Sequence, residues 1–64
     1  MPKEDLLTVD EVAGELRITP RTVRALVNSG RLPAIRVMDN REPRLRFRRS
    51  DLDAWLEERM VGRR

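Results

Sequence analysis

The chain has 64 residues and a net charge of +3. A chain of this length forms one small domain, which buries only about 60% of the surface that its unfolded state exposes. It contains no cysteine and no histidine, which excludes disulfides, thiolate catalysis and the usual zinc ligand sets. We therefore expect a protein that is not an enzyme and that needs no metal or cofactor.

Membrane and export signals are absent from the sequence. No apolar run approaches the roughly 18 residues that a membrane span requires. The first residues, MPKEDLL, lack the basic-then-apolar order of a secretory signal. We expect a soluble intracellular protein with no membrane partner.

The charges divide the chain into three segments of different sign. Residues 1–16 carry one lysine against five acids, a net of −4; residues 17–49 carry ten arginines against two acids, a net of +8; residues 50–64 carry three arginines against four acids, a net of −1. Thirteen of the fourteen basic residues are arginine, whose planar guanidinium suits bidentate contacts with phosphates and guanine edges. This pattern favours a nucleic-acid partner, although a high GC content of the gene would also enrich arginine.

A first helix is predicted over about residues 9–17. Thr8 and Glu11 have the spacing of a capping box, and Leu7 and Val12 occupy the positions of a hydrophobic staple. Gly14 lies beside the apolar side of this helix and costs about 1 kcal/mol relative to alanine. The residues of that apolar side recur with the helical period and are Val9, Val12, Ala13 and Leu16.

A second helix is predicted about three residues after the first. Thr19 is the expected N-cap, and Pro20 suits the first turn, where no amide partner is needed. Ile18 is expected to pack on Val23, and Gly30 supplies the left-handed residue that commonly ends a helix. The predicted apolar stripe is Val23, Leu26 and Val27. Two short helices with so short a connection are typical of a helix-turn-helix.

A β-hairpin is predicted after Pro33, which ends any helical pattern. In the next residues Ile35 and Val37 alternate with arginine, and further on Leu45 and Phe47 do the same. Each strand is therefore expected to have one apolar and one basic face. The turn formers DNREP (39–43) between the strands predict a loop of modest length.

A third helix is predicted to begin at Ser50, with Asp51 and Asp53 near the positive end of its dipole. Its expected buried stripe is Leu52, Trp55, Leu56 and Met60. Together these elements predict an α+β fold, a small winged helix-turn-helix with the order helix, helix, two-stranded wing and C-terminal helix. A single domain is expected over residues 1–64, with its core over about 6–60 and flexible ends.

The second helix is the predicted DNA-reading element. When its apolar stripe is buried, its other side can lie in a major groove, with N-terminal residues nearest the bases. Arginine there can donate to guanine, asparagine can bridge adenine, and amides at the helix start can bind a phosphate. The predicted DNA-binding residues of this helix are Thr19, Arg21, Thr22, Arg24 and Asn28. The alternative is a solvated helix face, which the absence of any acid between Leu16 and Asp39 disfavours.

The hairpin is the second predicted DNA-binding element. Arginine inserted in a narrow minor groove responds to its negative potential and width. The predicted DNA-binding residues of the hairpin are Arg36, Arg41, Arg44 and Arg46. The alternative is a solvated hairpin in which Asp39 and Glu42 pair locally with arginine.

Four further residues are assigned away from DNA. Trp55 follows Leu52 by three residues on a helical stripe, and Phe47 alternates with arginine in a strand, so both are expected in the core. Base stacking on single strands is then poorly supported, which favours duplex DNA. Arg48 and Arg49 adjoin the third helix and could as easily pair with Asp51 or Asp53, so they are not assigned to DNA.

The segments LTVDEVA, TPRTVRALVNSGRLPA and RRSDLDAWL resemble the excisionase group of small winged-helix DNA-binding proteins, which is related to the MerR-type domain. The resemblance covers about residues 6–59. It implies a recombination directionality factor of a phage or mobile element, a protein without catalytic activity that bends duplex attachment-site repeats and helps a cognate integrase in DNA excision. It also implies a cytoplasmic, nucleoid-associated location in a bacterial cell. By this resemblance, Arg21, Thr22 and Arg24 lie on the recognition helix, and Arg41, Arg44 and Arg46 lie on the wing.

The turn of the hairpin departs from many of these relatives, which join the two strands by a tight glycine turn. Here the segment MDNREPR (38–44) contains a proline and no glycine. The wing tip is therefore expected to be longer and stiffer than in those relatives.

Three functions remain open from the sequence. An excision factor is expected to bind several adjacent sites by cooperative head-to-tail self-association. A minimal MerR-like transcriptional regulator would use the same fold without a role in recombination. A phage protein-interaction or packaging adaptor would instead dock through the outward acids of the third helix, which are Asp53, Glu57 and Glu58.

Overall fold

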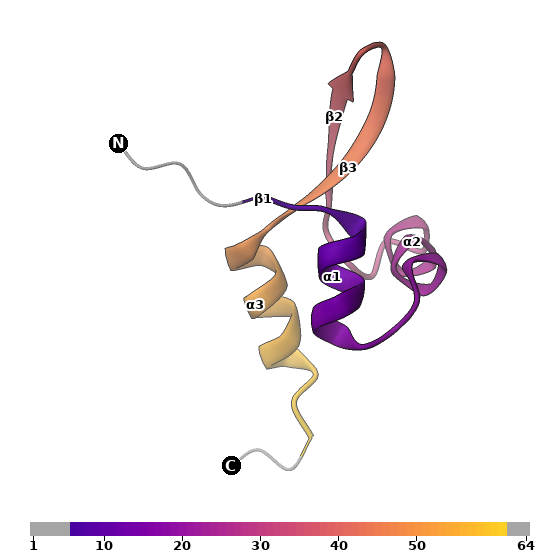
Figure 1. Cartoon of the computed structure of the whole chain (residues 1–64). Coiled ribbons are helices and arrows are strands. Elements are labelled where there is room, and N and C mark those ends of the chain that lie inside the picture. The colour runs from indigo at the N-terminus through magenta and orange to yellow at the C-terminus, as the bar shows by residue number, and fades with distance from the viewer. Residues whose placement is uncertain (1–5, 62–64) are drawn as a thin grey trace.

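The computed structural model describes residues 6–61 and shows a small α+β domain of three helices and one three-stranded antiparallel sheet (Figure 1). In chain order the elements are β1 (Leu6–Leu7), α1 (Val9–Leu16), α2 (Pro20–Asn28), β2 (Ile35–Asp39), β3 (Glu42–Arg48) and α3 (Arg49–Glu58). The predicted winged helix-turn-helix fold is confirmed. The ends expected to be flexible fall largely on residues 1–5 and 62–64, which lie outside the described residues.

Helix α1 begins through the local hydrogen bonds that the sequence predicts. The hydroxyl of Thr8 accepts from the amide of Glu11 at 3.1 Å, and the Glu11 carboxylate accepts from the amide of Thr8 at 2.8 Å. Together they form the predicted capping box. The helix ends at Leu16, one residue earlier than predicted, because Arg17 adopts the left-handed conformation with φ 58° and so cannot continue it.

Helix α2 follows after three residues and completes the predicted helix-turn-helix. Thr19 is the N-cap and Pro20 occupies the first turn. At the other end Gly30 has a φ of 78°, a conformation that costs glycine little. The Gly30 amide donates to the carbonyl of Val27 at 3.0 Å, so this turn closes the helix and directs the chain toward the hairpin.

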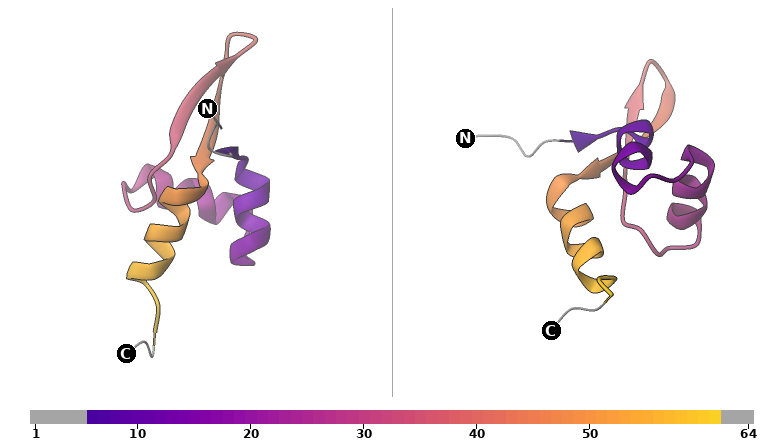
Figure 2. Two further views of the ribbon diagram at one scale, coloured as in Figure 1. Left: turned by 90° about the vertical axis from the view of Figure 1, so that its left-hand side faces the viewer. Right: turned by 60° about the horizontal axis from the view of Figure 1, so that its bottom comes forward.

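The sheet contains one strand more than the sequence predicts. Its order is β1-β3-β2, with β3 antiparallel to both neighbours. Strand β1 pairs Leu6 with Arg48 and Leu7 with Phe47, so it lies beside the end of β3, where α3 begins. The antiparallel ribbon formed by β2 and β3, called the wing below, projects away from the helices in every view (Figures 1 and 2).

The tip of the wing is tighter than predicted. Only Asn40 and Arg41 connect the two strands, and both are left-handed, with φ 52° and 68°. Two consecutive left-handed residues form the kind of turn whose twist matches a hairpin, and asparagine tolerates that conformation well. The expectation of a longer wing tip is therefore wrong, because Pro43 lies in β3 rather than in the turn.

The tight turn fixes a register that mixes the two predicted faces of the hairpin. Ile35 pairs with Arg46, and Val37 pairs with Arg44. Since paired residues share one face of a sheet, the apolar residues of β2 lie beside arginines of β3. The wing therefore has no purely basic face, although each strand alternates as predicted.

The core is formed by eight residues from β1, the three helices, β3 and the segment between α2 and β2, whereas β2 itself contributes no buried residue. They are Leu7, Val9, Val12, Ala13, Val23, Leu32, Phe47 and Leu52. Phe47 is fully buried, as predicted, and Leu32 is a core residue that the sequence interpretation missed. Trp55 is half-buried and packs against this cluster.

Helix α3 differs from its prediction at both ends. It begins at Arg49 after the N-cap residue Arg48, which makes no side-chain cap bond, so Ser50 lies inside the first turn. Leu56 and Met60, expected to be buried, are 37% and 54% exposed. The later turns of α3 run away from the sheet (Figure 1), so beyond Trp55 the helix is largely exposed. No helix within residues 6–61 has the length and apolar character needed to cross a membrane.

Candidate nucleic-acid interface

The outward side of α2 is exposed along its whole length. Val23 is completely buried, and this orients the helix so that its polar residues face solvent. All of the outward residues are exposed: Arg21, Thr22, Arg24, Ala25 and Asn28. Among residues 6–61, neither Arg21 nor Arg24 has a carboxylate within salt-bridge distance. Two guanidinium groups are thus presented to solvent without a compensating acid.

The start of α2 is largely occupied by its own cap. The hydroxyl of Thr19 accepts from the amide of Thr22 at 3.2 Å and lies 2.9 Å from the Thr22 hydroxyl. Pro20 has no amide proton to donate. Of the first three helical residues, only Arg21 keeps an amide that no described group accepts from. A phosphate at this position would be held by one amide and the neighbouring guanidinium groups.

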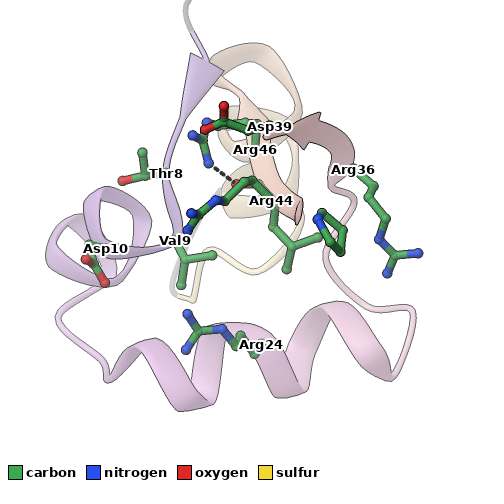
Figure 3. Close-up of a pocket in the computed structure, with 10 residues that line it drawn as sticks. Thr8, Val9, Asp10, Arg24, Arg36, Asp39, Arg44 and Arg46 are labelled. Carbon is green, nitrogen blue, oxygen red and sulfur yellow. Dashed lines mark hydrogen bonds between the residues drawn. The ribbon is translucent and has the colours of Figure 1, made fainter. Parts of the chain in front are cut away.

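A hollow of about 600 Å³ lies where α2, the wing and the start of α1 meet (Figure 3). Four predicted DNA-binding residues line it: Arg24, Arg36, Arg44 and Arg46. The other lining residues are Thr8, Val9, Asp10, Asp39, Pro43 and Leu45. The hollow therefore combines four arginines with two aspartates, and arginines from three different elements share one surface. Within the described part of the chain, no group of three or more acidic side chains is placed to hold a metal ion.

The wing arginines have different surroundings. Arg44 donates to the Glu42 carboxylate at 2.8 Å, so the local pairing considered as an alternative is present at this residue. Arg46 is half-buried and donates to the carbonyl of Leu45 at 2.9 Å. By contrast, Arg36 and Arg41 are exposed and have no acidic partner among residues 6–61. Figure 3 shows Arg36 extending outward from the hollow.

Arg49 takes part in a contact that the sequence interpretation missed. Its two terminal nitrogens donate to the two carboxylate oxygens of Glu15 at 2.8 and 2.7 Å, across 34 residues of sequence. Asp53, one of the two acids considered as its partner, lies farther away at 3.9 Å. The hydrogen bonds from Arg49 hold the pKa of the Glu15 carboxyl below its ordinary value of 4.5. Arg49 thus joins α1 to α3 and lies apart from the arginines of the hollow.

Trp55 does not offer a free ring for base stacking. The guanidinium carbon of Arg59 lies 4.4 Å from the centre of the indole ring, a distance typical of a cation–π contact. The indole Nε1 is buried and has no hydrogen-bond partner among the described residues. The ring is thus covered by Arg59 and the core.

Comparisons with known proteins agree with this architecture. The family described as "Helix-turn-helix domain" matches residues 6–60. Two curated proteins of Mycobacterium tuberculosis, from strains CDC 1551 / Oshkosh and ATCC 25618 / H37Rv, are each 54% identical to the chain over 35 residues, and each is named "Putative DNA-binding protein". The matched segment is 55% of this chain and 45% of either relative, so it spans about half the length of the curated relatives. Because the family match covers nearly the whole chain, the chain belongs to the helix-turn-helix domain family.

Proposed function

We propose that this chain is a sequence-specific protein that binds and bends duplex DNA. The observation that carries the proposal is the exposed side of α2, where Arg21 and Arg24 have no acidic partner among the described residues, next to a hollow lined by three arginines of the wing. The names of the two mycobacterial relatives support the same class of ligand.

In this proposal α2 lies in a major groove and the wing follows an adjacent groove. The outward arginines of α2 donate to guanine O6 and N7, and Asn28 bridges adenine. The wing arginines hold phosphates and follow the narrow groove between them. The residues assigned to DNA are Thr19, Arg21, Thr22, Arg24, Asn28, Arg36, Arg41, Arg44 and Arg46. Thr19 acts by fixing the first turn of α2, since its hydroxyl is already engaged by Thr22.

The biological role that we propose is that of an excisionase, a recombination directionality factor of a phage or mobile element. The sequence segments that resemble this group span most of the described chain, and the same chain forms the helix-turn-helix and the wing. Copies of the protein would bind neighbouring attachment-site repeats head-to-tail, bend them and favour excision by a cognate integrase. Such a protein works in the bacterial cytoplasm, on the nucleoid.

Footprinting across the attachment sites of the element, with and without its integrase, tests this role. Cooperative protection of several direct repeats in the attachment arms is the expected result. Protection of a promoter alone would contradict the role in excision. It would support the second candidate function, a minimal MerR-like regulator that uses the same interface. Failure to protect any duplex would contradict DNA binding itself.

An adaptor that docks through the acids of α3 is less well supported. Asp53 lies 3.9 Å from Arg49, and Glu58 lies 3.7 Å from Arg59. The charges of these two acids are therefore partly neutralised by Arg49 and Arg59. By contrast, no acid among residues 6–61 neutralises Arg21 or Arg24 of α2. The absence of an acidic partner for Arg21 and Arg24 within this described part of the chain therefore favours α2 over α3 as the interface.

A further inference from the structure

The tip of the wing carries two exposed apolar side chains at paired positions. Met38 of β2 is opposite Pro43 of β3. Met38 is 64% exposed, and Pro43 is also exposed. Neither residue belongs to the core or packs against it. The pair therefore has no evident role in holding the fold together.

The geometry of the hairpin brings these two side chains close to each other. The pair that flanks the two-residue turn is Asp39 and Glu42, and Met38 and Pro43 form the next pair. Hydrogen-bonded and non-hydrogen-bonded pairs alternate along an antiparallel ribbon, and the pair beside a two-residue turn is of the first kind. Met38 and Pro43 are thus a non-hydrogen-bonded pair, in which side chains approach most closely. This position also tolerates proline, because its missing amide proton would point away from β2.

Arginines flank this apolar pair along the wing. Arg36, paired with Leu45, is the next residue of β2 on the same face, and Arg41 lies on the turn beyond it. The acids of the tip, Asp39 and Glu42, alternate to the opposite face, where Glu42 is held by Arg44 at 2.8 Å. The apolar pair therefore lies between Arg36 on its own face and Arg41 at the turn.

We propose that Met38 and Pro43 form a wedge that inserts between two stacked base pairs from the minor groove of duplex DNA. This inference rests on the proposed function and deepens it by naming the surface that bends the DNA. Methionine and proline are among the side chains that unstack a base step in this way and kink the duplex toward the major groove. The flanking arginines would hold the phosphates on either side while the apolar pair replaces the lost stacking contact. A duplex suits this surface better than an apolar protein partner because arginines outnumber acids along the wing, with Arg36, Arg41, Arg44 and Arg46 against Asp39 and Glu42.

A bending measurement with matched variants tests the wedge. The probe is a duplex selected from a random library by the wild-type protein, labelled at both ends for energy transfer and carrying 2-aminopurine at successive steps. The double variant Met38→Ser/Pro43→Thr removes the apolar pair. Val37→Ser is the control, since Val37 is the neighbouring, 36% exposed apolar residue on the opposite face of β2.

The wild type is expected to kink the duplex by an angle on the order of 20–90° and to raise the 2-aminopurine fluorescence at one step. The double variant should bind within about tenfold of the wild type, because phosphate contacts supply most of the affinity, and should lose most of the bend and the fluorescence increase. Val37→Ser should keep both. Unchanged circular-dichroism melting would show that all variants are folded.

Several results would overturn the wedge and are distinct from a failure of DNA binding. An equal bend by the wild type and the double variant, or an equal loss in Val37→Ser, would contradict it. So would a double variant that bends DNA normally but no longer binds the integrase, because the pair would then be a protein-docking surface. Absence of any duplex binding by the wild type would instead refute the proposed function.

Discussion

Glu15 and Arg49 show how single residues connect elements that are distant in sequence. Their side chains are about 40% exposed, yet both carboxylate oxygens accept from the guanidinium. Two parallel hydrogen bonds of this kind fix the relative orientation of the two side chains more strictly than a single contact does. The pair fixes the end of α1 against the first turn of α3.

This ion pair predicts a measurable dependence of stability on pH. Because the folded-state pKa of Glu15 lies below its ordinary value of 4.5, its contribution is complete above that pH and is lost as the pH falls through the folded-state pKa. Thermal melts of the wild type and Glu15→Gln between pH 3 and 6 should therefore differ most at pH 6 and converge toward pH 3. Glu58→Gln is the control, since Glu58 lies 3.7 Å from its chain neighbour Arg59 and joins no second helix through that contact. A constant gap between wild type and Glu15→Gln over this range would contradict the ion pair.

Local contacts of single residues were predictable, and distant ones were not. The bonds of Thr8 with Glu11 and of Thr19 with Thr22 span three residues, so their spacing is visible in the sequence. The partner of Arg49 is 34 residues away and depends on how α3 packs. Leu32 also escaped prediction because it follows Gly30 in an irregular segment, where no periodicity marks a buried position.

At the scale of elements, the two helices of the helix-turn-helix were predicted nearly to the residue, whereas the sheet was not. Caps and apolar stripes determine α1 and α2 locally. Strand β1 has two residues and exists only through its pairing with β3, so its sequence carries no pattern of its own. The register of the wing depends on the left-handed conformations of Asn40 and Arg41. Because the turn contains no glycine, the sequence does not indicate that both residues adopt them.

Two glycines at different places in these elements should respond to alanine with opposite signs. A Cβ added to Gly14 would meet nothing within 4 Å, so Gly14→Ala should raise the free energy of unfolding by about 0.5–1 kcal/mol through helix propensity. Gly30 also has open space, but its φ of 78° is unfavourable for alanine, and Gly30→Ala should lower stability by about 1–2 kcal/mol. In a domain this small, 1 kcal/mol shifts the melting temperature by about 4–8 °C. Changes of the same sign in thermal melts would be inconsistent with these two conformations.

The turn of the wing allows stability and binding to be separated. Arg41 has a φ of 68°, so Arg41→Gly should relieve left-handed strain and raise stability by about 0.5–1 kcal/mol. The same substitution removes a charge from the wing tip and should weaken duplex binding, since each phosphate contact adds to affinity. Melting curves and fluorescence-anisotropy titrations of one preparation measure both effects. An unchanged affinity for duplex DNA would show that Arg41 is not part of the DNA interface.

At the scale of the whole molecule, the candidate interface is assembled from α2, the wing and the start of α1. The sequence indicated the basic residues individually, but their convergence on one hollow depends on the angle of the wing and on the register of β2 and β3. Within β3, Glu42 pairs with Arg44 two residues along the strand, and Asp39 of β2 also lines the hollow. The structure therefore distinguishes arginines that are already paired from those that remain available to an anionic partner.

The most direct test of DNA binding is the salt dependence of duplex affinity for the wild type, Arg24→Ala and Arg59→Ala. Arg24 lies on α2 and lines the hollow, whereas Arg59 lies over Trp55 at the end of α3. If about 6 phosphates are contacted, log affinity of the wild type should fall against log salt with a slope of roughly −5. Arg24→Ala should reduce the magnitude of the slope by about 1, and Arg59→Ala should leave it unchanged. An affinity independent of salt, or equal effects of the two substitutions, would contradict the proposal that the α2 face and the wing bind DNA.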